Sequence, residues 1–347
     1  MDKVAVIIVT YNSAGYIGEC LGSLARQTHT AHEVIVVDNA SSDDTVHAAS
    51  GYGAHIIKNH GNVGFAAANN IGASYAINQL GSEYIILLNP DTVAHERMIE
   101  ELLETMKSHP GCGIAQGKVF LMQDKALLNT SGNILNYLYF SYCDGYKKPD
   151  FITADKVIPV ASGACLMVRA EVLDKIGWLF NEDFFIYHED TDLSVRAMMA
   201  GYSVMLSSKA VVWHDYRFSS SKVKFFHMEK NRLFLLLQDH EPLTLLLLLP
   251  AVLFTEAQVL FFSIINGWLG YKIKSYFWLL ANFGRLLKRR RQVQAMRRVR
   301  DAGLFGQYAY EINFEEVNNP GLKYITNPAL RLHYEAVSRL IGAGSRD

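Results

Sequence analysis

The sequence predicts an α/β fold whose central sheet is mostly parallel. Three observations predict it: apolar runs that stop at polar turns, helical segments that follow these runs, and repetition of the pattern through the first third of the chain. The clearest run is residues 84–88, which stops at Asn89-Pro90-Asp91. Uninterrupted apolar runs of this length are typical of strands in a sheet that is covered on both faces.

Three further strands are expected, and each of them also ends in polar residues. They are residues 4–9, 33–37 and 55–58, and their ends carry Thr10-Tyr11-Asn12, Asp38-Asn39 and Asn59-His60-Gly61-Asn62. Strands that alternate with helices favour a parallel sheet. Because ligands of open α/β sheets bind beyond the carboxyl ends of the strands, the four polar ends are expected to form one crevice.

Asp91 is the residue of this crevice that best suits a hard cation and a phosphorylated ligand. Read alone, Asn-Pro-Asp is also ordinary turn chemistry. No Gly-X-Gly-X-X-Gly motif follows any of the expected strands, which disfavours a nicotinamide dehydrogenase. The combination of polar strand ends therefore carries more weight than any one motif.

Composition excludes some other classes. The formal net charge of −1 excludes a globally basic nucleic-acid binder. The four cysteines are scattered without zinc spacing, which is typical of small core residues in a reducing compartment. The first expected strand begins at Val4, so no signal peptide is expected ahead of it, and the catalytic domain is expected to be cytoplasmic.

The strand ends, together with three later motifs, resemble the family 2 inverting glycosyltransferases. The similarity is greatest to the rhamnosyltransferase-like branch, which builds bacterial surface polysaccharides. The shared features, in chain order, are Thr10-Tyr11-Asn12, Val36-Val37-Asp38-Asn39-Ala40-Ser41-Ser42-Asp43, Asn62-Val63-Gly64-Phe65, Leu88-Asn89-Pro90-Asp91, Ser162-Gly163-Ala164, His188-Glu189-Asp190-Thr191-Asp192-Leu193 and Trp213-His214.

This resemblance covers about residues 3–240 and implies a glycosyltransferase-A (GT-A) fold. One departure concerns the metal motif of the family, which is often Asp-X-Asp. Asn89 takes its first position here, so metal binding is expected to depend on Asp91.

The resemblance and the chemistry of glycosyl transfer together indicate which residues hold a nucleotide sugar. Asp38 is expected to accept the N3–H that uracil and thymine share, with Thr10, Tyr11 and Asn12 flanking the same nucleoside. A helix cap is the alternative role for Asp38, although the serines that follow can supply that cap. The remaining donor contacts are expected from a helix start, a ribose-binding amide and a close backbone approach, at Asn62, Phe65, Asn89, Gly163 and Ala164.

The expected metal ligands are Asp91 and His214, with Mg²⁺ or Mn²⁺ as the cation that stabilises charge on the leaving diphosphate. By its position in the family motif, Asp190 is expected to be the catalytic base. It also falls in the first turn of an expected helix, where the helix dipole favours acidic residues in any case. Asp192 is expected to pair with Arg196 four residues later.

The C-terminal part has a different composition, and three segments are expected: 1–240 as the catalytic domain, 241–303 as an apolar and basic helical segment, and 304–347 as a tail of unknown role. In the second segment, leucine-rich and aromatic stretches precede a run of arginines. Such a pattern favours interfacial helices on the anionic, cytoplasmic face of the cell membrane. A kinked transmembrane hairpin and a buried oligomer interface are the alternatives.

The expected activity is metal-dependent, inverting transfer of a sugar to a lipid-linked or polysaccharide acceptor. L-Rhamnose from dTDP-rhamnose is the first choice of donor, and another sugar from a UDP donor, such as galactofuranose, N-acetylglucosamine or glucose, is the alternative. A sugar nucleotidyltransferase would need a basic phosphate loop after the first strand, and residues 11–15 contain no basic residue. A catalytically dead membrane scaffold is the remaining alternative, which the intact acidic motifs disfavour.

Overall fold

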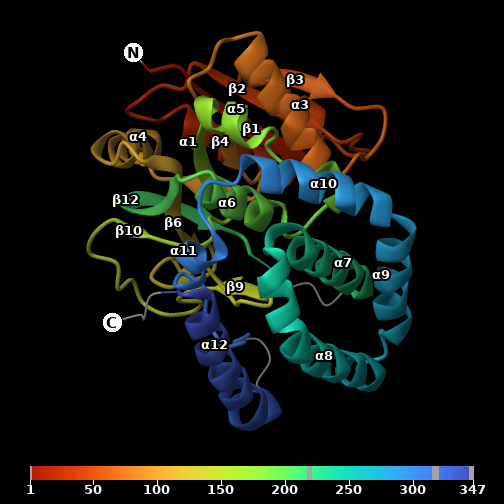
Figure 1. Cartoon of the computed structure of the whole chain (residues 1–347). Helices are drawn as coiled ribbons and strands as arrows, with labels where there is room; N and C mark the ends of the chain where they lie inside the picture. The colour runs from red at the N-terminus through yellow and green to blue at the C-terminus, as the bar shows by residue number, and fades with distance from the viewer. Residues whose placement is uncertain (1, 217–220, 315–319, 344–347) are drawn as a thin grey trace. The chain divides into compact units, whose positions relative to one another are not determined.

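The computed structural model describes residues 2–216, 221–314 and 320–343, and it divides the chain into two compact units. The first unit consists of residues 1–133, 143–197 and 202–217. The second consists of residues 134–142, 198–201 and 218–347. Figure 1 shows both units, with labels on most of their helices and strands.

The first unit is built on one mixed sheet with the strand order β10-β12-β6-β11-β4-β1-β2-β3. Four strands, all mutually parallel and all where the sequence predicts them, form one side: β1 (Val4–Thr10), β2 (Glu33–Asp38), β3 (His55–Lys58) and β4 (Tyr84–Leu88). The predicted α/β fold with a largely parallel sheet is therefore confirmed. All seven residues of β1 are buried, as expected for a central strand.

The other side of the sheet contains the antiparallel pairings. β11 (Cys165–Arg169) runs antiparallel to both β4 and β6 (Cys112–Leu121), and β12 (Ser203–His214) runs parallel to β6. Short strands extend this side: β5 (Thr92–Ala94), β7 (Leu128–Thr130) and β10 (Lys156–Val157). Two more short strands, β8 (Asn133–Leu135) and β9 (Ser141–Cys143), form a separate two-stranded sheet, and most of their residues fall in the second unit.

Helices cover both faces of this sheet. Alternate residues of β1, namely Val4, Val6 and Ile8, belong to one core cluster together with α1 and α4. Ile7 points the other way, toward α3, where a Cβ on Gly72 would lie 2.6 Å from Ile7 Cγ2. The helices of this unit are α1 (Ile17–Leu24), α2 (Thr45–Ser50), α3 (Phe65–Asn78), α4 (Met98–Ser108), α5 (Ala170–Ile176), the 3₁₀ turn η1 (Glu182–Phe184) and α6 (Glu189–Met199).

The second unit is helical. Its elements are α7 (Lys222–Asp239), α8 (Pro242–Ile265), α9 (Leu269–Ala281), α10 (Phe283–Met296), α11 (Asp301–Phe305), the π-helical turn η2 (Leu322–Thr326) and α12 (Asn327–Ile341). α7 precedes the boundary predicted at residue 240 and groups with the later helices by its contacts. The division of the chain into functional segments at 240 and 303 stays a prediction.

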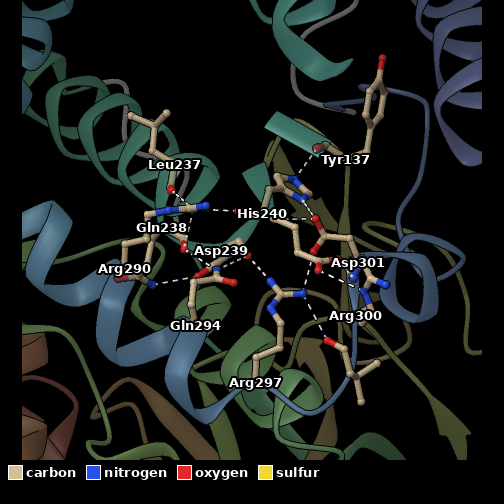
Figure 2. A network of polar contacts seen from close by, with 12 residues as sticks. Tyr137, Leu237, Gln238, Asp239, His240, Arg290, Gln294, Arg297, Arg300 and Asp301 are labelled. Carbon is tan, nitrogen blue, oxygen red and sulfur yellow. Dashed lines mark hydrogen bonds and ion pairs between the residues drawn. The ribbon is translucent and has the colours of Figure 1, made fainter. Parts of the chain in front are cut away.

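Two arginines of the basic run cap a helix within this unit. Figure 2 shows side chains from α10 and from the residue that follows it, and these side chains point at the last carbonyl groups of α7. Arg290 donates to the carbonyl oxygen of His240 at 2.7 Å, Gln294 donates to that of Asp239 at 2.7 Å, and Arg297 also contacts Asp239 O. Helix C-termini leave carbonyl groups without intrahelical partners, and cations there also complement the helix dipole. Arg290 and Arg297 therefore serve the fold.

Asp301 completes this cap in Figure 2. Its carboxylate lies 3.5 Å from His240 Nδ1 and 2.8 Å from Arg297 Nη1, and it accepts the backbone N–H of Glu241 at 2.7 Å. Burial would raise the pKa of Asp301, but these contacts outweigh burial and hold that pKa well below its usual range. The start of α8 is thus tied to α10 and α11 through one ionised carboxylate.

Candidate active site

Asp91 and His214 meet at the end of the sheet, as the sequence predicts. β4 ends at Leu88, and β5 pairs antiparallel with the last residues of β12, with His214 opposite Thr92. This pairing places Asp91 Oδ1 3.2 Å from His214 Nε2. Asn89 lies at the same corner, with Nδ2 3.5 Å from His214 Nε2.

Asn129, on β7, orients the imidazole of His214. Its Oδ1 lies 3.0 Å from His214 Nδ1, and both residues are buried. An acceptor at Nδ1 holds the proton on that nitrogen, so that Nε2 presents its lone pair toward Asp91. No sequence motif pointed to Asn129. The one feature that could have indicated a role is that it is a polar residue in a short strand.

This corner fits a divalent cation. Asp91 Oδ1 is buried and has no hydrogen-bond partner among the described residues, and it faces a second acceptor, Nε2 of His214. Two acceptors at this distance repel each other unless a cation or a proton lies between or beside them. Within the described ranges no group of three or more His, Cys, Asp or Glu side chains is placed to hold a metal ion, so further ligands would have to come from a phosphate or water.

Asp38 is held by hydrogen bonds at the ends of β1 and β2. Its Oδ1 accepts from Thr10 Oγ1 at 2.9 Å and from Ser41 Oγ at 2.5 Å, and its Oδ2 accepts from the Ser41 backbone N–H at 3.0 Å. The carboxylate is therefore neither a helix cap nor free. The expectation that the serines after Asp38 cap α2 is wrong, because Asp43 Oδ1 accepts from the N–H and hydroxyl of Thr45 there.

Tyr11 and Asn12 form the turn beside Asp38. Asn12 adopts a left-handed backbone conformation (φ 52°), and its Oδ1 accepts the backbone N–H of Ser42 at 2.9 Å. This bond ties the loop after β1 to the loop after β2. The Tyr11 side chain is 54% exposed, so its ring is accessible to a flat ligand.

The Asn62 turn connects to the same region through Asn39. Asn62 Oδ1 accepts the backbone N–H of Gly64 at 2.9 Å, and Asn39 Nδ2 donates to the Gly64 carbonyl at 3.3 Å. Gly64 has φ +90°, and a Cβ there would lie 2.5 Å from the Phe185 ring, so only glycine fits. α3 then begins at Phe65, whose ring lies 6.0 Å from that of Phe180.

Asp190 lies at the start of α6, directly after a backbone segment with three positive φ values at Phe185, Tyr187 and His188. Residues other than glycine rarely adopt this conformation, and such strain gathers at functional sites. The Asp190 carboxylate accepts the backbone N–H of Gly163 at 3.2 Å and that of Thr191 at 2.7 Å. Burial raises the pKa of Asp190, while these hydrogen bonds oppose the shift.

A continuous chain of contacts links Asp190 to the Asp91 corner. Asp190 binds the backbone of Gly163, and the carbonyl group of the adjacent Ala164 accepts the backbone N–H of Asn89 at 3.0 Å. Asn89 in turn lies beside His214. The antiparallel pairing of β11 with β4 produces this arrangement, because it sets the start of β11 beside the end of β4.

Asp192 serves the fold, as predicted. It pairs with Arg196 at 2.7 Å, and both side chains are fully buried. Arg196 also donates to the carbonyl oxygens of Trp178 at 2.8 Å and Leu179 at 2.7 Å. This network fixes the segment after α5 against α6 and so supports the turn that carries Asp190.

The sheet order, the flanking helices and the polar strand ends define an α/β domain of the GT-A type. Residues 5–177 match the family model described as Glycosyl transferase family 2. The chain therefore carries a family 2 glycosyltransferase domain, as the resemblance of its motifs implied.

Three relatives with assigned activities share between 24% and 30% of aligned residues with this chain. The low-salt glycan biosynthesis hexosyltransferase Agl10 of Haloferax volcanii is 30% identical over 197 residues, which cover 57% of this chain and 62% of that protein. The N-acetylglucosaminyl-diphospho-decaprenol L-rhamnosyltransferase of Mycobacterium tuberculosis is 24% identical, covering 65% and 80%. The rhamnosyltransferase WbbL of Escherichia coli K12 is 26% identical, covering 66% and 90%. The chain thus spans less than two thirds of Agl10.

Solved structures support the fold alone. TarS of S. aureus, residues 1–349 in complex with UDP, superposes with a TM-score of 0.51 at 18% identity, over 99% of this chain and 92% of that one. GalNAc-T7 with UDP, GalNAc and Mn²⁺ has a TM-score of 0.51 at 13% identity, over 62% of this chain and 44% of that one.

Proposed function

We propose that this chain transfers a sugar, with inversion, from a nucleotide-sugar donor to a lipid-linked or polysaccharide acceptor in the synthesis of cell-surface glycans. The observation that carries this proposal is the chain of contacts from Asp190 through Gly163, Ala164 and Asn89 to the Asp91 corner. It links a buried carboxylate to the corner where, in this proposal, the diphosphate and the cation would lie.

In this proposal Asp91 and His214 hold Mg²⁺ or Mn²⁺. The bound cation would supply neutralisation of the charge that develops on the departing diphosphate. Asp91 contributes a carboxylate oxygen, and the imidazole of His214, oriented by Asn129, contributes Nε2. A mixed oxygen and nitrogen ligand set of this kind suits both metals and slightly favours Mn²⁺.

Asp190 is proposed as the general base. Its carboxylate would take the proton from the acceptor hydroxyl while that oxygen forms a bond to the anomeric carbon. The bond from the anomeric carbon to the diphosphate breaks on the opposite side, so the configuration inverts in one displacement. The raised pKa of Asp190 strengthens it as a base, and the hydrogen bonds from Gly163 and Thr191 fix the direction of its oxygens.

The donor nucleotide is proposed to lie against Asp38, with Thr10, Tyr11 and Asn12 around the nucleoside. The donor would also contact Asn62, Phe65, Asn89, Gly163 and Ala164. L-Rhamnose from dTDP-rhamnose is supported by the rhamnosyltransferases among the relatives. A UDP donor is the second candidate, supported by the fold similarity to a UDP complex. Asp38 does not discriminate between them, because uracil and thymine present the same N3–H.

The acceptor is proposed to be used at the cytoplasmic face of the cell membrane, with peripheral or re-entrant attachment. Among the described residues, α8 is the one helix that is long and apolar enough to cross a membrane. Because composition alone does not separate the two, self-association of the chain through the apolar surface of α8 is the alternative to membrane attachment.

A donor panel tests this function. Purified chain is incubated with dTDP-rhamnose, UDP-sugars and GDP-sugars in Mn²⁺, and the release of nucleoside diphosphate is measured with and without a polyprenyl-diphosphate-linked sugar. We expect release of dTDP or UDP that chelation of the metal abolishes. Release that continues unchanged in the presence of a chelator would overturn the metal assignment, and turnover by the Asp190→Asn variant equal to wild type would overturn the base assignment.

A further inference from the structure

α8 exposes apolar side chains, an inversion of the pattern of a helix on the surface of a soluble protein. Its buried positions are Thr244, Leu248, Ala251, Thr255 and Ser263, of which three are polar. Throughout this fully described helix the strongly exposed large side chains are apolar: Leu243, Leu246, Leu249, Leu253, Phe254, Phe261, Ile264 and Ile265.

α9 repeats this inversion. Lys272 and Ser275 are its fully buried residues, whereas Ile273, Phe277 and Leu280 are exposed. Phe283 and Leu287 continue the exposed apolar side chains into the first part of α10. We call these exposed residues of α8, α9 and α10 the apolar strip.

A buried ring of charges joins α7, α8 and α9. On α7, Glu229 and Arg232 pair at 2.9 Å, and on α8 and α9, Glu256 and Lys272 pair at 2.7 Å. Arg232 also contacts Glu256, and Lys272 also contacts Glu229, which closes the ring. Each cation thus has two carboxylate partners from two different helices.

This ring opposes a transmembrane orientation of α8. At 24 residues α8 is about 36 Å long, enough to cross a hydrocarbon core of about 30 Å. A helix that left its neighbours to do so would carry Glu256 into lipid and leave Arg232 and Lys272 sharing one carboxylate. Buried charges that lose a partner are strongly unfavourable. The charge ring therefore holds α8 beside α7 and α9.

The charge of the surrounding surface indicates what covers the strip. Glu256 is the only acidic residue between positions 242 and 296. Along α9 and α10, which the structure describes throughout, the exposed charged side chains are Lys274, Arg285, Lys288 and Arg291. A second copy of this chain packed face to face would set these cations against each other, whereas an anionic bilayer attracts them.

We infer that α8, α9 and the first part of α10 lie in the plane of an anionic bilayer, with the apolar strip in one leaflet and no span across it. This inference deepens the proposed membrane attachment and rests on it, but not on any step of sugar transfer. The apolar strip contributes a part of the membrane-binding free energy that salt does not screen. The lysines and arginines contribute a part that salt weakens.

Flotation with phosphatidylglycerol-containing vesicles tests the strip. Wild-type chain should float, partly resist high salt, and bind far less to neutral vesicles. Leu280→Glu should lose at least about tenfold in vesicle affinity, since a charge enters the leaflet. Leu332→Glu on α12 is the matched control, because both leucines are 71% exposed. Equal loss in both variants, or a wild type that stays unbound and elutes as a discrete oligomer, would overturn the inference.

Depth measurements separate lying in the plane from spanning. Leu243→Cys, Leu253→Cys and Ile264→Cys are made one at a time in a Cys143→Ser background, since the other three cysteines are buried. Each is labelled with an environment-sensitive fluorophore and quenched by lipids carrying spin labels at different depths. We expect similar, shallow depths at all three positions. A deep centre between two shallow ends would establish a spanning helix, and the inference would fail while the proposed sugar transfer stood.

Discussion

Asp190 and Asp192 lie two residues apart in the first turn of α6, and their replacement by asparagine should separate a group that acts on substrate from one that holds the fold. Asp192 is fully buried against Arg196, which donates to it at 2.9 Å. Among the residues that the structure describes, Asp190 accepts from backbone N–H groups and from the Thr191 hydroxyl. The same change of atoms therefore meets two different environments.

For Asp192→Asn, we expect a large loss of stability. Removing one partner of a buried ion pair costs about 3–5 kcal/mol, because the other charge stays buried without compensation. For a domain of 150–250 residues this corresponds to a fall of roughly 6–20 °C in the midpoint of thermal unfolding. Asparagine keeps an oxygen for one hydrogen bond but no charge for the Arg196 guanidinium.

For Asp190→Asn, we expect little change in stability and a loss of turnover of at least about 10²-fold, the usual scale for removing a general base. Because folding raises the pKa of Asp190, its contribution to stability is fully present below the unfolded pKa of 3.8 and is lost as pH rises through the folded value. At neutral pH the ionised Asp190 carboxylate therefore lowers the free energy of unfolding, and replacement by asparagine removes this penalty. Asparagine also disrupts one backbone hydrogen bond, worth about 1 kcal/mol, so the two effects oppose each other.

Thermal unfolding followed by circular dichroism, together with diphosphate release and nucleotide affinity by calorimetry, would measure both variants. The reasoning is refuted if Asp190→Asn unfolds at as low a temperature as Asp192→Asn, or if it keeps normal turnover. A collapse of donor affinity in Asp190→Asn would make this residue a binding group and place the base elsewhere.

Three further outcomes follow from the same geometry. Asp91→Ala should abolish metal-dependent binding of UDP or dTDP in calorimetry while the circular dichroism spectrum is retained, and unchanged affinity in Mn²⁺ would contradict the ligand assignment. Asn129→Leu should weaken Mn²⁺ binding, followed by electron paramagnetic resonance, by about 10–100-fold; Asn129→Asp keeps an acceptor for His214 Nδ1 and should restore much of it. Burial would raise the pKa of Glu229, but Arg232 and Lys272 outweigh burial and lower that pKa to about 2. The stability that Glu229 provides is therefore present above its unfolded pKa of 4.5 and should be lost between about pH 4.5 and 2, seen as a fluorescence transition that Glu229→Gln flattens.

The strands and their polar ends could be predicted from the sequence because the cause is local. Apart from the Tyr84 hydroxyl, residues 84–88 carry apolar side chains, so such a run favours burial in a compact fold, and a proline and a carboxylate follow it. The pairing of Asp192 with Arg196 was equally accessible, since residues four apart on a helix share a face. The family motifs also predicted the order in which the polar strand ends occur along the chain.

Contacts between residues far apart in the chain were decided only by tertiary structure. Asn129 reaches His214 because β7 and β12 both pair with β6, and nothing near Asn129 in the sequence shows that pairing. Ser41 was expected to cap a helix, but it donates its backbone N–H to Asp38 instead. The N–H of Thr45, at the start of that helix, is bound by Asp43.

In the C-terminal unit, the sequence by itself determined that α8 is apolar, since composition is independent of conformation. Which way its few polar residues point was decided by its neighbours. Glu256 turns inward because α7 and α9 present Arg232 and Lys272 there, and a buried charge requires such partners. The outward face then consists of the apolar residues that remain, which is why composition alone could not distinguish a spanning helix from one that lies on a surface.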